Sequence, residues 1–186
     1  METKNHLPLV GRSNKFERSE EFFGRGEAAN TRPPPGSLRS PTSPQGGGNV
    51  VVQIARSWIG TPYIHQASVR GAGCDCLGLL RGVWRALHGE EPETPPPYAP
   101  DWSEATATET LYMALARHLT EIDKRAIAPG DVALFRMIPN GPAKHCGIVA
   151  SNSHGLTLIH ARQNKRVSEE AFSRWWCGRL AYAFRM

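Results

Sequence analysis

Apolar residues recur along this chain with two different spacings. Over residues 50–58 they return every three or four positions, which is typical of a helix that buries one face, and Gly60 ends the pattern. A second helical pattern begins at Cys76 and ends at Gly89, and a third covers residues 104–119. The first part of the folded chain is therefore predicted to be helical.

Short apolar runs bounded by turn residues dominate the rest of the chain. They predict strands over residues 132–135, 146–150, 156–161 and 180–184. A turn-forming run, Ser-Asn-Ser-His-Gly, separates the second strand from the third and predicts a β-hairpin. Residues 168–175 have the pattern of a capped short helix, because a serine precedes two glutamates and an alanine. Helices followed by strands indicate an α+β domain.

The first 48 residues differ in composition from the rest. They are polar and rich in glycine, proline and serine, so we predict a disordered tail over residues 1–48 and a folded domain over residues 49–186. No apolar run approaches the roughly 20 residues that cross a bilayer. The first ten residues also lack the pattern of a secretory signal. We expect neither a membrane span nor a signal peptide.

Charge and cysteine content exclude several classes of function. The net charge is +5, but the basic residues are scattered and match no nucleic-acid-binding motif, so nucleic acid is not an expected partner. Cys74 and Cys76 are too close to form a framework disulfide, and the other two cysteines are isolated. The Cys and His spacings also differ from those of common structural zinc sites. We expect no metal and no other cofactor.

Cys76 is the candidate nucleophile, because it stands where a glycine-rich loop becomes a helix. The first backbone N–H groups of a helix are unpaired, and their partial positive charge stabilises a thiolate. They are also placed to hold an oxyanion. Gly78 leaves room for close backbone approach. The alternative is a small cysteine that only packs at the helix start.

Two histidines flank the predicted hairpin. His145 comes just before its first strand and His160 lies in its second strand, so an antiparallel pairing brings both to the same end. We predict a catalytic triad in which His145 is the general base and acid for Cys76 and His160 orients the His145 ring. The alternatives are a structural hydrogen bond at a strand edge for His145 and a surface position for His160.

Several ordered blocks of this chain resemble the NlpC/p60 family of cell-wall cysteine peptidases. The resemblance covers about residue 50 to the C-terminus, and each block alone is a weak signal, whereas their order and separation are specific. The blocks are Gly60–Tyr63, Asp75–Leu79, Gly130–Phe135, His145–Val149 and Ile159–Ala161.

This resemblance implies a papain-like α+β fold with helices packed on a small antiparallel sheet. It implies an endopeptidase that cuts peptidoglycan stem peptides, commonly between D-glutamate and a diamino acid, with Cys76 as nucleophile, His145 as base and His160 as orienting residue. Tyr63 would border the substrate cleft, and Asp75, beside the nucleophile, would help to hold the stem. Peptidoglycan is then the partner.

Two positions depart from the family pattern. The family usually has serine after the nucleophile, where this chain has Leu77, and valine after the base, where it has Cys146. Leu77 bears on stem specificity and is the best sequence argument for an alternative, a non-catalytic tail or wall-binding module of the same fold. A related thiol amidase or acyltransferase is a further alternative. Cys146 is expected to be a packing substitution.

The run His65–Ser68, which leads into the cysteine loop, resembles the small peptidases encoded among tail genes of phages and phage-like gene transfer particles. That resemblance implies a protein assembled into a particle tail in the cytoplasm, together with other tail proteins. The particle would then carry it to the cell wall or periplasm.

Overall fold

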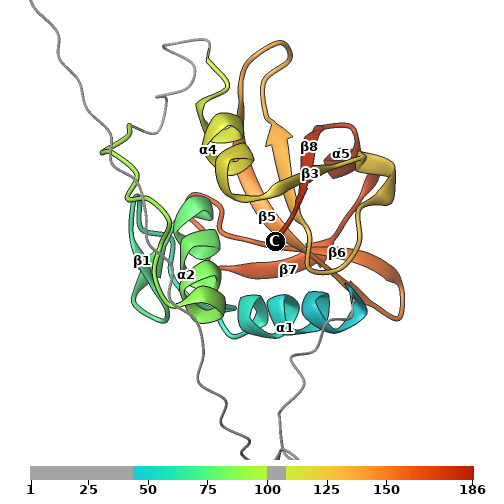
Figure 1. Cartoon of the computed structure of the whole chain (residues 1–186), viewed down its shortest axis with the longest axis horizontal. Coiled ribbons are helices and arrows are strands. Elements are labelled where there is room, and N and C mark those ends of the chain that lie inside the picture. Colours follow the sequence, from blue (N-terminus) through green and yellow to red (C-terminus); the bar gives the residue numbers. More distant parts are fainter. Residues whose placement is uncertain (1–43, 100–107) are drawn as a thin grey trace, which may run out of the picture. The chain divides into compact units, whose positions relative to one another are not determined.

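An antiparallel sheet of six strands forms the centre of the described part of the chain (Figure 1). The structure, a computed structural model, describes residues 44–99 and 108–186. The strand order is β3-β8-β4-β5-β6-β7. The strands are β3 (Thr120–Ile122), β4 (Val132–Arg136), β5 (Ala143–Asn152), β6 (Gly155–His160), β7 (Ser168–Ala171) and β8 (Leu180–Arg185).

Helices precede and cover this sheet, so the described residues form an α+β fold. In Figure 1, α1 (cyan) lies below the strands and α2 (green) lies to their left. A separate two-stranded ribbon forms the loop that leads into α2. The remaining elements are α1 (Pro44–Arg56), β1 (Ser68–Val69), β2 (Gly73–Cys74), α2 (Cys76–His88), α4 (Thr110–His118), the 3-10 turn η1 (Lys124–Ala126) and α5 (Arg174–Cys177).

The two faces of the sheet bury different sets of side chains, because successive residues of a strand point to opposite sides. On one face, Leu134 and Ile148 pack with the apolar sides of α1, α2 and α4. On the other face, their neighbours Phe135 and Val149 pack around Trp176 of α5. The catalytic candidates lie where these two layers meet the start of α2.

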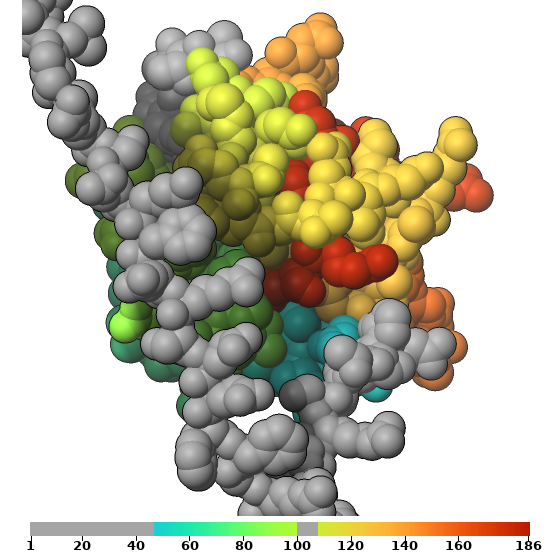
Figure 2. Space-filling model, in the orientation of Figure 1, coloured from blue at the N-terminus to red at the C-terminus, as the bar shows by residue number. Residues whose placement is uncertain are grey.

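Close packing joins the end of α1 to the middle of α2. Gly82 lies against the Trp58 ring, and a Cβ atom at position 82 would come within 1.9 Å of that ring. The chain's last residue, Met186, packs against the same cluster. The space-filling view shows this arrangement from outside, with C-terminal residues (red) between α1 (cyan) and the yellow residues that include α4 and β3 (Figure 2).

A β-bulge interrupts the pairing of β4 with β5 just before His145. Phe135 lies opposite His145, but Arg136 lies opposite Ala143, so β4 advances by one residue where β5 advances by two. Bulges of this kind bend a strand and turn its side chains. The bulge therefore helps to set the direction in which His145 leaves the sheet.

Most of the predicted elements are confirmed. Helix α2 begins at Cys76 and ends at His88, with Gly89 as its cap at a φ of 88° that favours glycine. The four predicted strands are present as β4, β5, β6 and β8, and β5 and β6 form the expected hairpin. Helix α1 begins at Pro44, earlier than the expected domain boundary at residue 49.

The helix predicted over residues 168–175 is wrong. Residues Ser168–Ala171 form strand β7, which pairs with β6, and only Arg174–Cys177 are helical. Tertiary contacts override the local helix signal. Glu169 pairs with Arg56 at 2.7 Å across the fold, which holds this segment along the sheet edge.

Two predictions fall partly outside the described residues. The helix expected over residues 104–119 is seen as Thr110–His118, and its expected beginning lies outside the described part. Residues 44–48 of the disordered tail expected over residues 1–48 belong instead to helix α1. Residues 1–43 also lie outside the described part, and the disorder expected there stays a prediction. Among the helices of the described residues, none has the length and apolar character needed to cross a membrane.

Candidate active site

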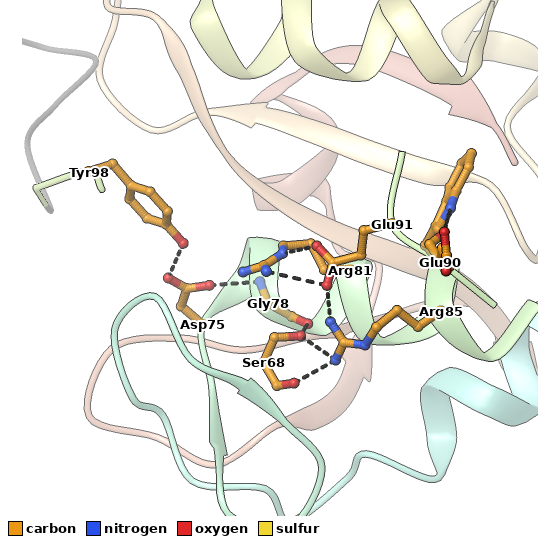
Figure 3. Close-up of polar contacts among 9 residues, drawn as sticks. Ser68, Asp75, Gly78, Arg81, Arg85, Glu90, Glu91 and Tyr98 are labelled. Atoms are coloured by element: carbon orange, nitrogen blue, oxygen red, sulfur yellow. Dashed lines mark hydrogen bonds and ion pairs between the residues drawn. The ribbon is translucent and has the colours of Figure 1, made fainter. Parts of the chain in front are cut away.

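Cys76 is the first residue of α2, and its neighbour Asp75 caps that helix. The Asp75 carboxylate accepts a hydrogen bond from the backbone N–H of Gly78 at 2.7 Å, as an N-cap residue does (Figure 3). The Cys76 side chain is half-buried. The thiol therefore lies at the positive end of the helix dipole, where a thiolate is stabilised.

The loop before α2 approaches the helix so closely that only glycine fits at position 78. A Cβ atom on Gly78 would lie 1.9 Å from the backbone oxygen of Ala67. On the same side, the Ser68 hydroxyl donates to the Gly78 carbonyl at 2.5 Å. These contacts fix the first turn of the helix, and with it the position of Cys76.

The hairpin brings His145 and His160 together, as the sequence predicts. His145 Nε2 lies 2.8 Å from His160 Nδ1. Gly147 lies against β6, and a Cβ atom there would lie 2.7 Å from Leu158 Cδ1 and 3.0 Å from the His160 Cβ. Glycine at this position therefore leaves room for Leu158 and His160.

A carboxylate lies on the far side of His160 from His145. Glu170 Oε1 lies 3.2 Å from His160 Nε2, although the ring N–H does not point along a hydrogen bond. The same oxygen accepts from Trp176 Nε1 at 2.8 Å. The charge of Glu170 favours a proton on His160 Nε2, so His160 Nδ1 accepts from His145 Nε2. The other ring nitrogen of His145, Nδ1, is then the one available to the thiol.

Trp176 packs against both imidazoles. Its ring is stacked on His145 at a centroid distance of 5.5 Å and meets His160 edge-on at 4.9 Å. His160 is fully buried. Burial, followed by the charges of His145 and Arg162, lowers the pKa of His160 to about 3. His160 is therefore neutral at neutral pH and suited to orienting rather than to proton transfer.

The surroundings of Cys76 favour its thiolate. Hydrogen bonding from Cys146 lowers the pKa of Cys76 well below its usual range, and hydrogen bonding and charge from His145 add to this effect against the opposing effect of burial. The Cys146 pKa is raised, because Cys146 donates to the Cys76 sulfur and is itself buried. The arrangement stabilises an ionised Cys76 beside a neutral Cys146 thiol.

The two predicted substrate-binding residues lie close to this thiol. Burial raises the pKa of Tyr63 to about 12, and the charges of Cys76 and Asp75 add to the effect. Tyr63 thus stays a neutral hydrogen-bond donor beside the site. Asp75 is buried and accepts from backbone N–H groups of Gln66 and Gly78, which assigns it a structural part in the helix start. Contact of either residue with a substrate stays a prediction.

Sequence reasoning missed four residues of the site. Cys146 was expected to be a packing residue only, although it stands next to His145. Glu170 has no sequence signal, because its segment has a helical pattern and forms strand β7 only by pairing with β6. Trp176 lies in α5, where a helix position favours a core residue over a role at the site. Tyr98 donates to Asp75 from a proline-rich segment that carried no signal. In the described ranges, no three His, Cys, Asp or Glu side chains are grouped to hold a metal ion.

Comparison with known proteins agrees with this geometry at the level of fold. No protein-family model matches the sequence, and no curated protein matches it. Among solved structures, the NlpC/p60 domain of the peptidoglycan hydrolase SagA superposes with a TM-score of 0.53 at 24% identity, over 75% of this chain and 98% of that domain. The chain has the NlpC/p60 fold. The papain-like α+β prediction is therefore confirmed.

Two further structures share the NlpC/p60 fold. An NlpC/p60 family protein from Bacillus cereus has a TM-score of 0.52 at 20% identity, over 75% of this chain and 39% of that protein. The peptidoglycan hydrolase RipB from Mycobacterium tuberculosis has a TM-score of 0.50 at 18% identity, over 84% of this chain and 73% of RipB. This chain thus spans about two fifths of the Bacillus protein.

Replacing Cys146 tests the hydrogen bond that it donates to Cys76. Cys146→Ala removes the donor and is expected to raise the pKa of Cys76, so that iodoacetamide labels Cys76 about three- to tenfold more slowly below neutral pH. Cys146→Ser keeps an O–H donor and should label like the wild type. Labelling is followed by mass spectrometry of the Cys76 peptide against pH. Equal rates in the alanine variant and the wild type would contradict the prediction.

The depressed pKa of His160 predicts acid-sensitive stability. The unfolded chain takes up this proton near pH 6.5, whereas the folded protein does so only near pH 3, so protonation favours unfolding in between. Relative to His160→Asn, the wild type should lose up to about 1.4 kcal/mol of unfolding free energy per pH unit. Urea titrations from pH 7 to pH 4 measure this, with the exposed His154→Asn as control. If the difference in unfolding free energy between the wild type and His160→Asn does not change between pH 7 and pH 4, the prediction is contradicted.

Proposed function

We propose that this protein is a cysteine-type hydrolase that cuts an amide bond in peptidoglycan stem peptides. The observation that carries the proposal is the continuous set of groups at one site: a thiol at a helix N-terminus, His145 beside it, and the buried His160 bonded to His145 at 2.8 Å. This set has the nucleophile, base and orienting group that amide hydrolysis through a covalent intermediate needs.

The first half of the reaction follows from the charges at the site. The Cys76 thiolate attacks the carbonyl carbon of the amide, and the oxyanion that forms is held by N–H groups at the start of α2. The C–N bond then breaks while protonated His145 gives its proton to the leaving amine. A thioester on Cys76 and a free amine result.

The second half restores the enzyme. Neutral His145 takes a proton from a water molecule, which attacks the thioester carbonyl, and the C–S bond breaks to release the carboxylic acid and the Cys76 thiolate. His160 stays neutral throughout because of its low pKa, so it holds the His145 ring without competing for the proton.

The substrate class is supported by the structures that share the fold. SagA and RipB are described as peptidoglycan hydrolases, and an N-acetylmuramoyl-L-alanine amidase from Bacteroides uniformis has a TM-score of 0.50 at 12% identity. Within this class we propose an endopeptidase that cuts between D-glutamate and a diamino acid, as the sequence blocks around Cys76 and His145 suggest. The amidase bond is the competing site of cleavage.

Purified sacculi test this proposal directly. The wild type is expected to clear them, Cys76→Ala to be inactive, and His145→Gln to lose at least about 100-fold in rate. Mass spectrometry of the products identifies the bond, because an endopeptidase leaves a free diamino acid amine and an amidase leaves a free alanine amine.

The exposed cysteine supplies the matched control. Cys177→Ala removes a thiol outside the site and should retain wild-type activity. Clearance by Cys76→Ala at the wild-type rate would overturn the enzymatic proposal. Sacculi that are bound but left intact by the wild type as well would support the non-catalytic module instead.

We further propose that the protein travels in the tail of a phage-like particle and acts on the wall or in the periplasm. The support is the resemblance of the run His65–Ser68 to tail-encoded peptidases. Proteomics of purified particles is expected to find the chain there, enriched over an abundant cytosolic enzyme. Recovery only with the cytosolic fraction would count against carriage by a particle.

A further inference from the structure

A proline-rich segment, residues 91–99, is attached to α2 at both of its ends. At its beginning, Glu91 pairs with Arg81 at 2.6 Å and with Arg85 (Figure 3). At its other end, the Tyr98 hydroxyl donates to Asp75 Oδ2 at 2.5 Å. The segment therefore spans from the middle of the helix to the cap beside Cys76.

Tyr98 is held by its backbone as well as by its side chain. Its carbonyl accepts from the Gln66 side chain at 2.6 Å and lies 2.7 Å from His65 Nε2. The other ring nitrogen of His65, Nδ1, lies 3.6 Å from Asp75 Oδ2, so this imidazole also faces the carboxylate. Gln66 has a φ of 62°, which is uncommon for a residue other than glycine, and its own N–H donates to Asp75 at 2.7 Å. Three segments of the chain thus converge on one carboxylate.

The Asp75 carboxylate has opposing effects on the neighbouring thiol. Its bond to Gly78 fixes the helix start, but its negative charge disfavours a thiolate nearby. That charge acts across the cluster, since it contributes to the raised pKa values of Cys74 and Cys146. Each hydrogen bond that Asp75 accepts offsets part of its charge.

We propose that Tyr98 is a positioning residue for Cys76, acting through the Asp75 carboxylate that caps the helix. Its short O–H···O hydrogen bond holds the Asp75 carboxylate in its capping position. The same bond offsets part of the negative charge of that carboxylate, which would otherwise disfavour the neighbouring Cys76 thiolate. Burial and the bond to Asp75 raise the pKa of Tyr98, so the phenol remains a proton donor at all working pH values. The inference rests on the proposed role of Cys76 as nucleophile.

The variant Tyr98→Phe removes the hydroxyl and keeps the ring. Without this donor the Asp75 charge is less compensated, so the pH midpoint for iodoacetamide labelling of Cys76 should rise, and labelling below the midpoint should slow about three- to tenfold. The rate on the high-pH plateau should not change. Mass spectrometry of the Cys76 peptide reports the labelling, and thermal unfolding monitors the fold.

Tyr112→Phe is the matched control. The Tyr112 hydroxyl also donates to a carboxylate, that of Glu121 at 2.9 Å, but this bond is exposed and does not involve Asp75. It should leave the labelling midpoint unchanged. A midpoint in Tyr98→Phe equal to that of Tyr112→Phe would overturn the proposal.

Asp75→Asn tests the route through the carboxylate. Asparagine keeps the cap acceptor but has no charge, so the labelling midpoint should fall, and adding Tyr98→Phe should then have little further effect. An unchanged midpoint in Asp75→Asn, or a full Tyr98→Phe effect in that background, would show that Tyr98 does not act through Asp75. If Tyr98→Phe fails to fold, an unchanged midpoint in Asp75→Asn alone still overturns the proposal.

Labelling of Cys76 needs no peptidoglycan, so the positioning role of Tyr98 and the proposed hydrolase activity can be refuted independently. A protein that shows the expected midpoints but leaves sacculi intact would retain the Tyr98 inference and lose the proposed hydrolase activity. A protein that clears sacculi but labels identically with and without the Tyr98 hydroxyl would do the reverse.

Discussion

The hydrogen bond from Gly78 N–H to the Asp75 carboxylate fixes the start of α2, and the candidate site depends on that start. It directs the positive end of the helix dipole toward Cys76, the first helical residue. Position 78 must also be glycine, because the backbone carbonyl of Ala67 in the preceding loop occupies the space that a side chain would need. The capping bond, the close loop approach and the thiol form one local unit, which the sequence run from Asp75 to Gly78 encodes.

The imidazole side of the site is built differently, from residues far apart along the chain. The hairpin aligns His145 with His160, the bulge in β5 bends the strand before His145, and α5 supplies the Trp176 ring that stacks on it. These contacts bury His160 and keep it neutral. The thiol side is therefore set by one helix start, whereas the imidazole side needs the assembled sheet. Reactivity is expected to appear only when the whole domain has folded.

This difference explains what could be predicted from sequence. The start of α2, the hairpin and the meeting of His145 with His160 follow from local patterns and antiparallel geometry. Glu170 could not be predicted, because the local signal of its segment is helical and only pairing with β6 makes it a strand. Tyr98 could not be predicted either, since its bond to Asp75 joins positions 23 residues apart through a segment without periodicity. The catalytic roles themselves stay predictions.

The bulge in β5 also has a consequence for changes in chain length. Lys144 is the inserted residue, because it lies between the pairs Phe135–His145 and Arg136–Ala143. Its deletion would leave both pairs in register and keep His145 and Cys146 on their present faces, since β5 stays paired with β4 and β6 beyond this point. The strand would lose only its bend before His145. The single extra residue therefore controls the direction of the strand and not its parity.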